Sequence, residues 1–203
     1  MVGPVPEGIR LLQRSLDLCP TAPVVDRAAA LIGLALTSSH IGAAEPALRA
    51  SDAALTLLDD ADPAHDVLVL EAHLRRCNAL ADMGAGEELR SAAVAFGAAC
   101  DRRDPPGPMR AAALWSVGAV QFQDGNMAAV VETLTAAHEI SARSGFAAGE
   151  GISDLHLAWY LLADPRAAPE RARRALVLLV RAVTVFGRQA NRSNELSVLY
   201  AGR

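Results

Sequence analysis

The clearest hydrophobic pattern runs over residues 111–142, where apolar residues return every three or four positions on both sides of an Asp-Gly-Asn tripeptide. This spacing predicts two amphipathic helices. Gly125, the middle residue of the tripeptide, marks the predicted end of the first helix, because glycine adopts the left-handed cap conformation at little cost. Gly118 and Ala137 are small, so we expect the two helices to approach closely there. The segment predicts an antiparallel helical hairpin.

The same pattern recurs along the chain. Each predicted hairpin has a small residue at one position of its first helix, and these residues are Gly33, Cys77, Gly118 and Ala158. Their separations of 44, 41 and 40 residues indicate a repeating unit. We expect about nine or ten helices, with breaks near Pro20–Pro23, His40–Ala44, Asp62, Gly84, Asp104–Pro108, Gly125, Gly145–Gly149, Asp164 and Gly187–Asn191.

The hairpin at residues 111–142 resembles the tetratricopeptide repeat. The family pattern has a large residue, a Leu-Gly pair, a glycine turn, and then an alanine, an aromatic or large residue and another alanine. These places are filled by Leu114, Val117, Gly118, Gly125, Val130, Leu134 and Ala137. Gln121 departs from the pattern, where a tyrosine is usual, and we expect Phe122 to take over its packing. The resemblance implies an all-α, right-handed superhelical solenoid of antiparallel hairpins, formed by residues 1–203 as a single domain.

The composition favours helical packing. The chain is 52% hydrophobic but only 4% aromatic, so its core must consist mainly of Ala, Leu and Val. The net charge of −4 and the lack of a basic patch predict no direct binding to nucleic acid. Residues 1–6 lack the features of a signal peptide, and no apolar stretch is long enough to span a bilayer.

The three cysteines, Cys19, Cys77 and Cys100, have no CxxC spacing and lie among apolar residues. We expect all three to be small buried side chains in a reducing cytoplasm.

A wider similarity covers most of the chain. The segments EGIRLLQRSLDL, RAAALIGLAL and GNMAAVVETLTAAHEISARSGF are similar to the C-terminal arrays of large actinobacterial ATP-binding regulators of the LuxR type. The resemblance implies a module that senses effectors or partners and restrains an ATPase. The chain itself has no GxxxxGK[ST] motif and no recognisable helix-turn-helix.

In such arrays the first helices of successive units line an inner groove. The residues expected in this groove combine aromatic anchors with polar groups, as a peptide or small-molecule site requires. They are Arg75, Asn78, Trp115, Phe122, Gln123, His156 and Trp159. The alternative, which stays open at this point, is that both tryptophans pack in the core.

No catalytic motif of the HExxH, GxSxG or Rossmann type occurs. His73 and Cys77 are one helical turn apart, but a zinc site needs about four ligands. We therefore expect ordinary packing there, with no catalytic residue, no metal and no cofactor. Polar and charged groups expected on the solvated surface are His40, His65, His138, Asp59, Asp60, Asp62 and the basic run 166–174.

The leading hypothesis is a protein- or effector-binding module of a cytoplasmic bacterial transcriptional regulator, which is not an enzyme. The second is a free-standing adaptor that scaffolds a protein complex, and the third is a small helical enzyme or accessory subunit. The expected partner is a protein, a peptide or a small-molecule effector, with no nucleic acid and no membrane. The helices predicted at 5–18 and 191–200 lack partner helices, so self-association is expected through Ile9, Leu12, Leu16, Leu196 and Leu199.

Overall fold

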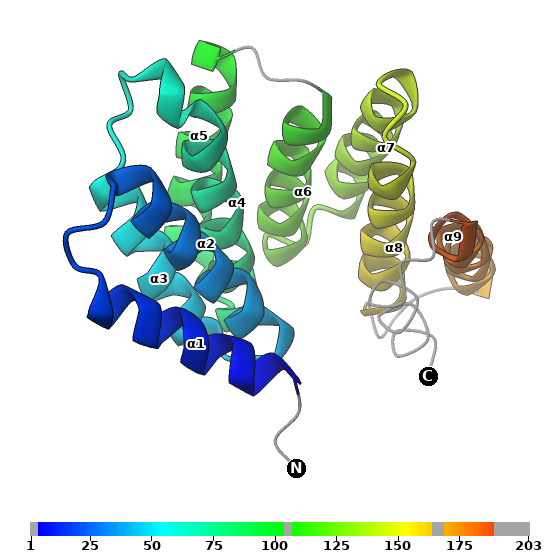
Figure 1. The fold of residues 1–203 in the computed structure, drawn as a ribbon. Helices are drawn as coiled ribbons and strands as arrows, with labels where there is room; N and C mark the ends of the chain where they lie inside the picture. Colours follow the sequence, from blue (N-terminus) through cyan, green and yellow to red (C-terminus); the bar gives the residue numbers. More distant parts are fainter. Residues whose placement is uncertain (1–3, 104–106, 164–168, 189–203) are drawn as a thin grey trace. The chain divides into compact units, whose positions relative to one another are not determined.

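The computed structural model describes residues 4–103, 107–163 and 169–188, and this part of the chain contains nine α-helices, one short 3₁₀ helix and no strand (Figure 1). For these described residues the prediction of an all-α fold is confirmed. The chain divides into two packing units, Met1–Arg103 and Asp104–Arg203.

The first unit holds five of the α-helices. In chain order its elements are α1 (Pro4–Leu18), α2 (Val24–His40), α3 (Ala44–Leu57), the 3₁₀ helix η1 (Pro63–His65), α4 (Asp66–Met83) and α5 (Gly86–Arg103). Each helix packs against the next one in the sequence, and α2 also packs against α4. The unit is therefore built from local hairpins whose first helices touch one another.

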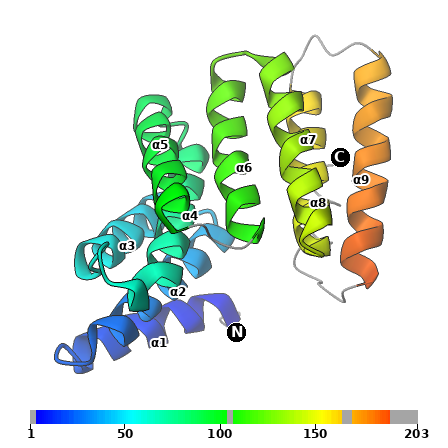
Figure 2. The same cartoon turned by 90° about the horizontal axis from the view of Figure 1, so that it is seen from above.

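The second unit repeats this arrangement with α6 (Gly107–Gln123), α7 (Met127–Arg143), α8 (Ala147–Ala163) and α9 (Pro169–Arg188). Consecutive helices pack together, and α6 also packs against α8. Figures 1 and 2 both show α6 and α9 at opposite ends of the unit, with α9 beside α8.

Tight glycine turns separate the helices where the sequence predicts them. Gly84 and Gly125 have φ angles of 67° and 72°, in the left-handed region that glycine tolerates. Asn126 then begins α7, because its side chain accepts a hydrogen bond from the backbone N–H of Ala129 at 3.2 Å. The predicted breaks within the described residues all fall between helices or at their ends. The break near Asp164 and the positions 104–106 and 189–191 lie outside the described residues.

Small residues let the paired helices approach closely. A Cβ atom added at Gly118 would lie 3.0 Å from Leu134 Cδ2, so the predicted close contact between α6 and α7 is confirmed. The core consists mainly of Ala and Leu, with Phe96 in the first unit and Phe186 in the second as its largest fully buried side chains.

Two expectations about burial need correction. Cys77 and Cys100 are buried as predicted, but Cys19 is exposed. The prediction for Cys19 was wrong because α1 ends at Leu18 and leaves Cys19 in the turn before α2. The apolar side chains Ile9, Leu12 and Leu16 of α1 are partly buried, because α1 packs against α2.

The second terminal helix expected to expose apolar residues, at 191–200, lies outside the described residues. Among the described helices, none combines the length and apolar character needed to cross a membrane.

Candidate functional site

An aromatic cluster joins α6 and α8 in the second unit. The rings of Phe122 and Tyr160 stack with centroids 4.5 Å apart, and Tyr160 also stacks on Trp159 at 6.1 Å. His156 lies between Trp115 and Tyr160, at centroid distances of 5.9 and 6.3 Å. Four of the seven predicted groove residues, Trp115, Phe122, His156 and Trp159, therefore meet in one cluster.

The two tryptophans differ in exposure. Trp115 is only 9% exposed and donates its indole N–H to Ser153 Oγ at 2.9 Å, so its ring fills the contact between α6 and α8. Trp159 is 54% exposed. The expectation that both tryptophans point to one open surface is thus wrong for Trp115, because the neighbouring first helix covers it. Trp159 remains accessible to a ligand.

His156 is half-buried against the aromatic rings of Trp115 and Tyr160. Its Nδ1 is buried and has no hydrogen-bond partner among the described residues. Burial lowers the pKa of His156 to about 4, because the apolar surroundings penalise the charged imidazolium. The imidazole is therefore neutral at pH 7 and contributes packing rather than charge.

Of the other three predicted groove residues, one belongs to the second unit and two belong to the first. Gln123 is exposed at the last position of α6. Arg75 and Asn78 are half-buried on α4, in the first unit. Arg75 Nη2 forms an ion pair with Glu71 Oε2 at 2.8 Å. Within each unit, the structure brings only the aromatic subset together.

A cavity in the first unit was not predicted. It is widely open to solvent, has a volume of about 340 Å³ and lies among α3, α4, α5 and the segment after α3. This volume falls near the lower end of the range for small-molecule sites, roughly 300–1,000 Å³. Its lining is mostly apolar with three polar side chains, and consists of Leu55, Leu58, Asp60, Val69, His73, Ala95, Ala98 and Arg102.

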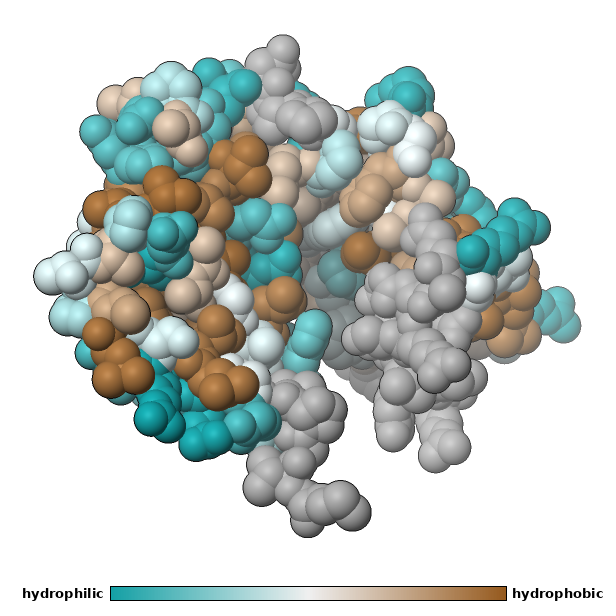
Figure 3. All heavy atoms as spheres, in the orientation of Figure 1, coloured by the Kyte–Doolittle hydropathy of each residue, from teal (hydrophilic) through white to brown (hydrophobic). Residues whose placement is uncertain are grey.

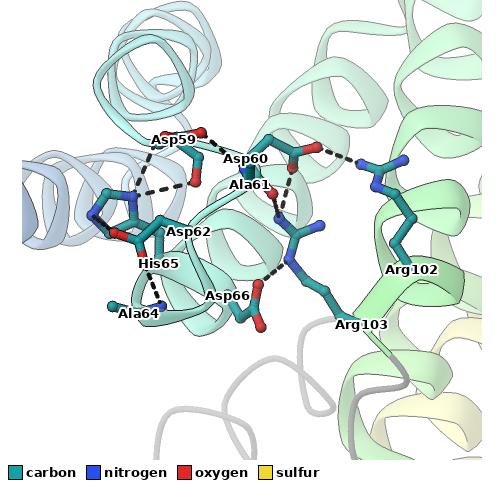
Figure 4. Close-up of polar contacts among 9 residues, drawn as sticks. All are labelled: Asp59, Asp60, Ala61, Asp62, Ala64, His65, Asp66, Arg102 and Arg103. Atoms are coloured by element: carbon teal, nitrogen blue, oxygen red, sulfur yellow. Dashed lines mark hydrogen bonds and ion pairs between the residues drawn. The ribbon is translucent and has the colours of Figure 1, made fainter.

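Two arginines of α5 meet Asp60 at the edge of this cavity (Figure 4). Arg102 Nη2 lies 2.8 Å from Asp60 Oδ2, and Arg103 Nη2 lies 2.7 Å from Asp60 Oδ1. Arg103 Nε also contacts Asp66 Oδ1 at 2.6 Å. Burial by itself raises the pKa of Asp60, but the hydrogen bond and charge of Arg103, with the charge of Arg102, outweigh it, so the pKa is lowered. Asp60 is therefore a stable carboxylate shared by two cations.

The loop that carries Asp60 is held by its own polar groups (Figure 4). The backbone N–H of Asp59 donates to His65 Nδ1 at 3.0 Å, and Asp59 Oδ1 accepts from the N–H of Ala61 at 2.9 Å. Asp62 Oδ1 accepts from the N–H of Ala64 at 2.9 Å and so begins the 3₁₀ helix. The aspartates form the polar turn that the sequence predicts, and Asp60 is additionally used for the ion pairs with α5. The expectation that His65 lies on the solvated surface was wrong, because its ring folds back onto this turn and is only 13% exposed.

His73 is the third polar side chain of the lining, beside Asp60 and Arg102. Burial lowers the pKa of His73, and the positive charges of Arg76, Arg102 and Arg103 lower it further, against the opposing effect of Asp60. Its Nδ1 is buried with no hydrogen-bond partner among the described residues. A neutral imidazole with an unsatisfied nitrogen can form a hydrogen bond with a bound molecule.

A second polar cluster links α7, α8 and α9. His138 Nδ1 lies 3.2 Å from Asp154 Oδ1, and Arg181 Nε lies 3.2 Å from Asp154 Oδ2. Arg181 Nη2 also lies 3.1 Å from His138 Nε2. A guanidinium only donates hydrogen bonds, so His138 Nε2 accepts and the ring proton sits on Nδ1, facing the carboxylate.

This cluster holds three helices together. Burial raises the pKa of Asp154, and the neighbouring His138 and Arg181 oppose that shift. The expectation that His138 is polar surface was wrong, since α8 and α9 both supply partners for its ring.

The sequence analysis did not predict that Asp60 forms ion pairs with Arg102 and Arg103. The usable signal was charge complementarity at a separation of about one repeat: the contacts join residues 42 and 43 positions apart. Among the described residues, no group of three or more His, Cys, Asp or Glu side chains is placed to hold a metal ion.

No family model matches the chain, and comparison with the curated proteins and with the solved structures finds no match either.

Proposed function

We propose that this chain is an effector-binding helical-repeat module, and that its first unit takes a small, largely apolar molecule with one anionic group. The observation that carries the proposal is the cavity of about 340 Å³ among α3, α4 and α5. Its apolar walls suit a hydrocarbon body, and its few polar groups can orient one end of the molecule.

The polar lining favours an anionic end. Arg102 shares Asp60 with Arg103, and the side chain of Arg102 is half-exposed. A ligand carboxylate can therefore replace Asp60 as the partner of Arg102, while Asp60 keeps its ion pair with Arg103. His73 is neutral, so it offers a hydrogen bond without adding an opposing charge.

Binding here gives a simple route to regulation. The cavity walls come from three helices and a loop, so a bound molecule stabilises one relative placement of α3 and α5. A ligand shifts a conformational equilibrium by as much as its affinities for the two states differ. In this proposal the module belongs to a cytoplasmic bacterial transcriptional regulator of the LuxR type, and its hairpins stack as a right-handed tetratricopeptide-like solenoid.

The architecture part of the proposal is supported by several features. Helices pack in sequence-adjacent pairs, the first helices of neighbouring pairs touch, and the small landmark residue Gly118 lies at a helix contact. The regulator part rests on the sequence resemblance.

Calorimetric titration tests the proposed site, with octanoate and 1-octanol as probes. We expect the chain to bind octanoate, and Ala98→Leu to abolish binding by filling the cavity. Ala53→Leu, on an exposed position of α3, is the matched control and should bind normally. Arg102→Gln should weaken octanoate by about fivefold or more without affecting octanol. Unchanged octanoate binding by Ala98→Leu would exclude this cavity.

A second candidate function is an adaptor that binds a protein or peptide through Trp159. The observation that favours it is the 54% exposure of this ring, supported from behind by Tyr160. Exposed, rigidly stacked aromatic rings are frequent anchors of protein interfaces. A fluorescence titration in which Trp159→Ala abolishes partner binding, while octanoate binding persists, would separate the two functions.

A further inference from the structure

Helix α9 has two apolar faces, although only one of them packs against α8. The buried face consists of Ala175, Leu178, Leu179, Ala182 and Phe186. The opposite face carries Leu176, Val177, Val180 and Val183, which are 62%, 59%, 58% and 37% exposed. In Figure 3, hydrophobic residues lie beside strongly hydrophilic ones over α9, at the right edge of the view.

Comparison with α7 indicates what this second face is suited to bind. The buried residues of α7 are Val130, Leu134, Ala137 and Ser141, and they share the spacing of the buried series that starts at Ala175 in α9. By this alignment Val183 corresponds to His138, which contacts α8. One position that α7 turns toward its next helix is thus exposed on α9, where Val183 is 37% exposed.

The same alignment shows that the exposed face of α9 is more apolar than that of α7. Val177 and Val180 correspond to Glu132 and Thr135, which are exposed on α7. The solvated face of a helix usually carries polar or charged residues, so valines at these two positions are unusual for a face that contacts only water. An apolar stripe of this length on a helix fits the stripe of another amphipathic helix.

The charged residues beside the exposed face of α9 distinguish between the molecules that could bind there. Arg173 falls on the same face as Val180, seven residues earlier, and Arg188 flanks its other end; both are exposed. Two copies of α9 packed antiparallel would bring the arginines at opposite ends of the helix together, which is unfavourable. The segment 189–203 is a poor match too, because its charged residues are Arg192, Glu195 and Arg203.

We propose that the exposed face of α9 is a docking surface for an amphipathic helix of another protein, one whose apolar stripe is flanked by acidic residues. Leu176, Val177, Val180 and Val183 bind the stripe, and Arg173 and Arg188 pair with the acidic residues. This surface shares no residue with the cavity in the first unit, so the proposal does not depend on the proposed effector.

The test uses two synthetic, fluorescein-labelled helical peptides of equal length. Both have leucines at positions i, i+3, i+4 and i+7; one has glutamates beside this stripe and the other has lysines. Fluorescence anisotropy should show binding of the glutamate peptide and a preference over the lysine peptide of about tenfold or more. Equal affinity for both peptides, or binding of neither, would overturn the proposal.

Variants locate the binding face. Val180→Gln should weaken the glutamate peptide about tenfold or more, whereas Val94→Gln, at a position of α5 that is 69% exposed, should have no effect. Arg173→Glu should shift the preference toward the lysine peptide. An unchanged affinity in Val180→Gln, or an unchanged preference in Arg173→Glu, would assign the binding to another surface.

Three further measurements address other occupants. Sedimentation that shows dimers disrupted by Val180→Gln would assign the face to a second copy of the chain. If only the chain truncated after Arg188 binds the peptide, the segment 189–203 is the occupant. If the chain binds vesicles containing anionic phosphatidylglycerol through Val180 but neither peptide, the face contacts a lipid surface. Each of these three results contradicts the proposal.

Discussion

Acidification should destabilise the second unit through His156. The ring lies between Trp115 and Tyr160, and burial lowers its pKa from 6.5 to about 4. Because the pKa in the folded state lies below that in the unfolded state, the unfolded chain binds more protons between these two pH values. The contribution of His156 to stability is therefore fully present above about pH 7 and is lost as the pH falls toward 4.

The size of the effect follows from the pKa. A decrease from 6.5 to about 4 corresponds to a total of about 3 kcal/mol, since one pK unit equals about 1.4 kcal/mol. Between pH 7 and pH 4.5, linkage gives a loss of about 2 kcal/mol in the free energy of unfolding. The pKa of His73, in the first unit, is also lowered, so its contribution to stability is likewise lost as the pH falls. Asp154 acts in the opposite direction, because its raised pKa contributes stability at low pH that is lost as the pH rises.

Comparison with His156→Phe isolates the contribution of this one group. Phenylalanine keeps an aromatic ring between Trp115 and Tyr160 but does not titrate. Urea denaturation would be followed by tryptophan fluorescence at both pH values, and both tryptophans lie in the second unit, so the signal reports that unit. The variant should lose about 2 kcal/mol less than the wild type between pH 7 and pH 4.5. Equal losses in both proteins would refute the argument from burial.

Three further variants test packing and polar contacts. Gly118→Leu should overpack the contact between α6 and α7 and cost about 1–3 kcal/mol; thermal melts without any loss would contradict the assigned contact. Trp159→Ala should change stability little because its ring is exposed, whereas Trp115→Ala should cost about 3–5 kcal/mol; the order of the two denaturation midpoints checks this. Arg103→Met should cost about 0.2–1 kcal/mol, because Asp66 loses its arginine while Asp60 keeps Arg102 and both carboxylates are partly exposed. The matched exposed variant Arg90→Met should stay within about 0.5 kcal/mol by circular-dichroism melts.

Helix boundaries could be predicted because their causes are local. Gly84 and Gly125 end helices through their own backbone conformations, and Asn126 begins α7 with its own side chain. The pairing of successive helices follows from short turns, which leave little choice of neighbour. The close contact at Gly118 could be predicted because the repeat places a small residue there.

The environments of individual side chains depend on what lies opposite, and the sequence pattern does not show this. Trp115 and Trp159 both lie on first helices, but α8 covers Trp115 while Trp159 has no such cover among the described residues. His138 is drawn into ion pairs because Asp154 and Arg181 come from two other helices.

The cavity was missed for the same reason. Its lining comes from α3, α4, α5 and a loop, and the small side chains Ala95 and Ala98 leave space only once these elements are assembled. Each wall by itself has an ordinary helical pattern.

The sequence-adjacent packing of the helices has a consequence for synthesis on the ribosome. In each unit every substantial helix contact joins neighbours or next-but-one neighbours in the chain. Proteins rich in such local contacts fold quickly, because little loop-closure entropy is lost before contacts form. A helix of this chain can thus bury its apolar face soon after the following helix emerges, without waiting for distant segments. We expect short-lived exposure of unfolded apolar surface, and correspondingly little need for chaperones during translation.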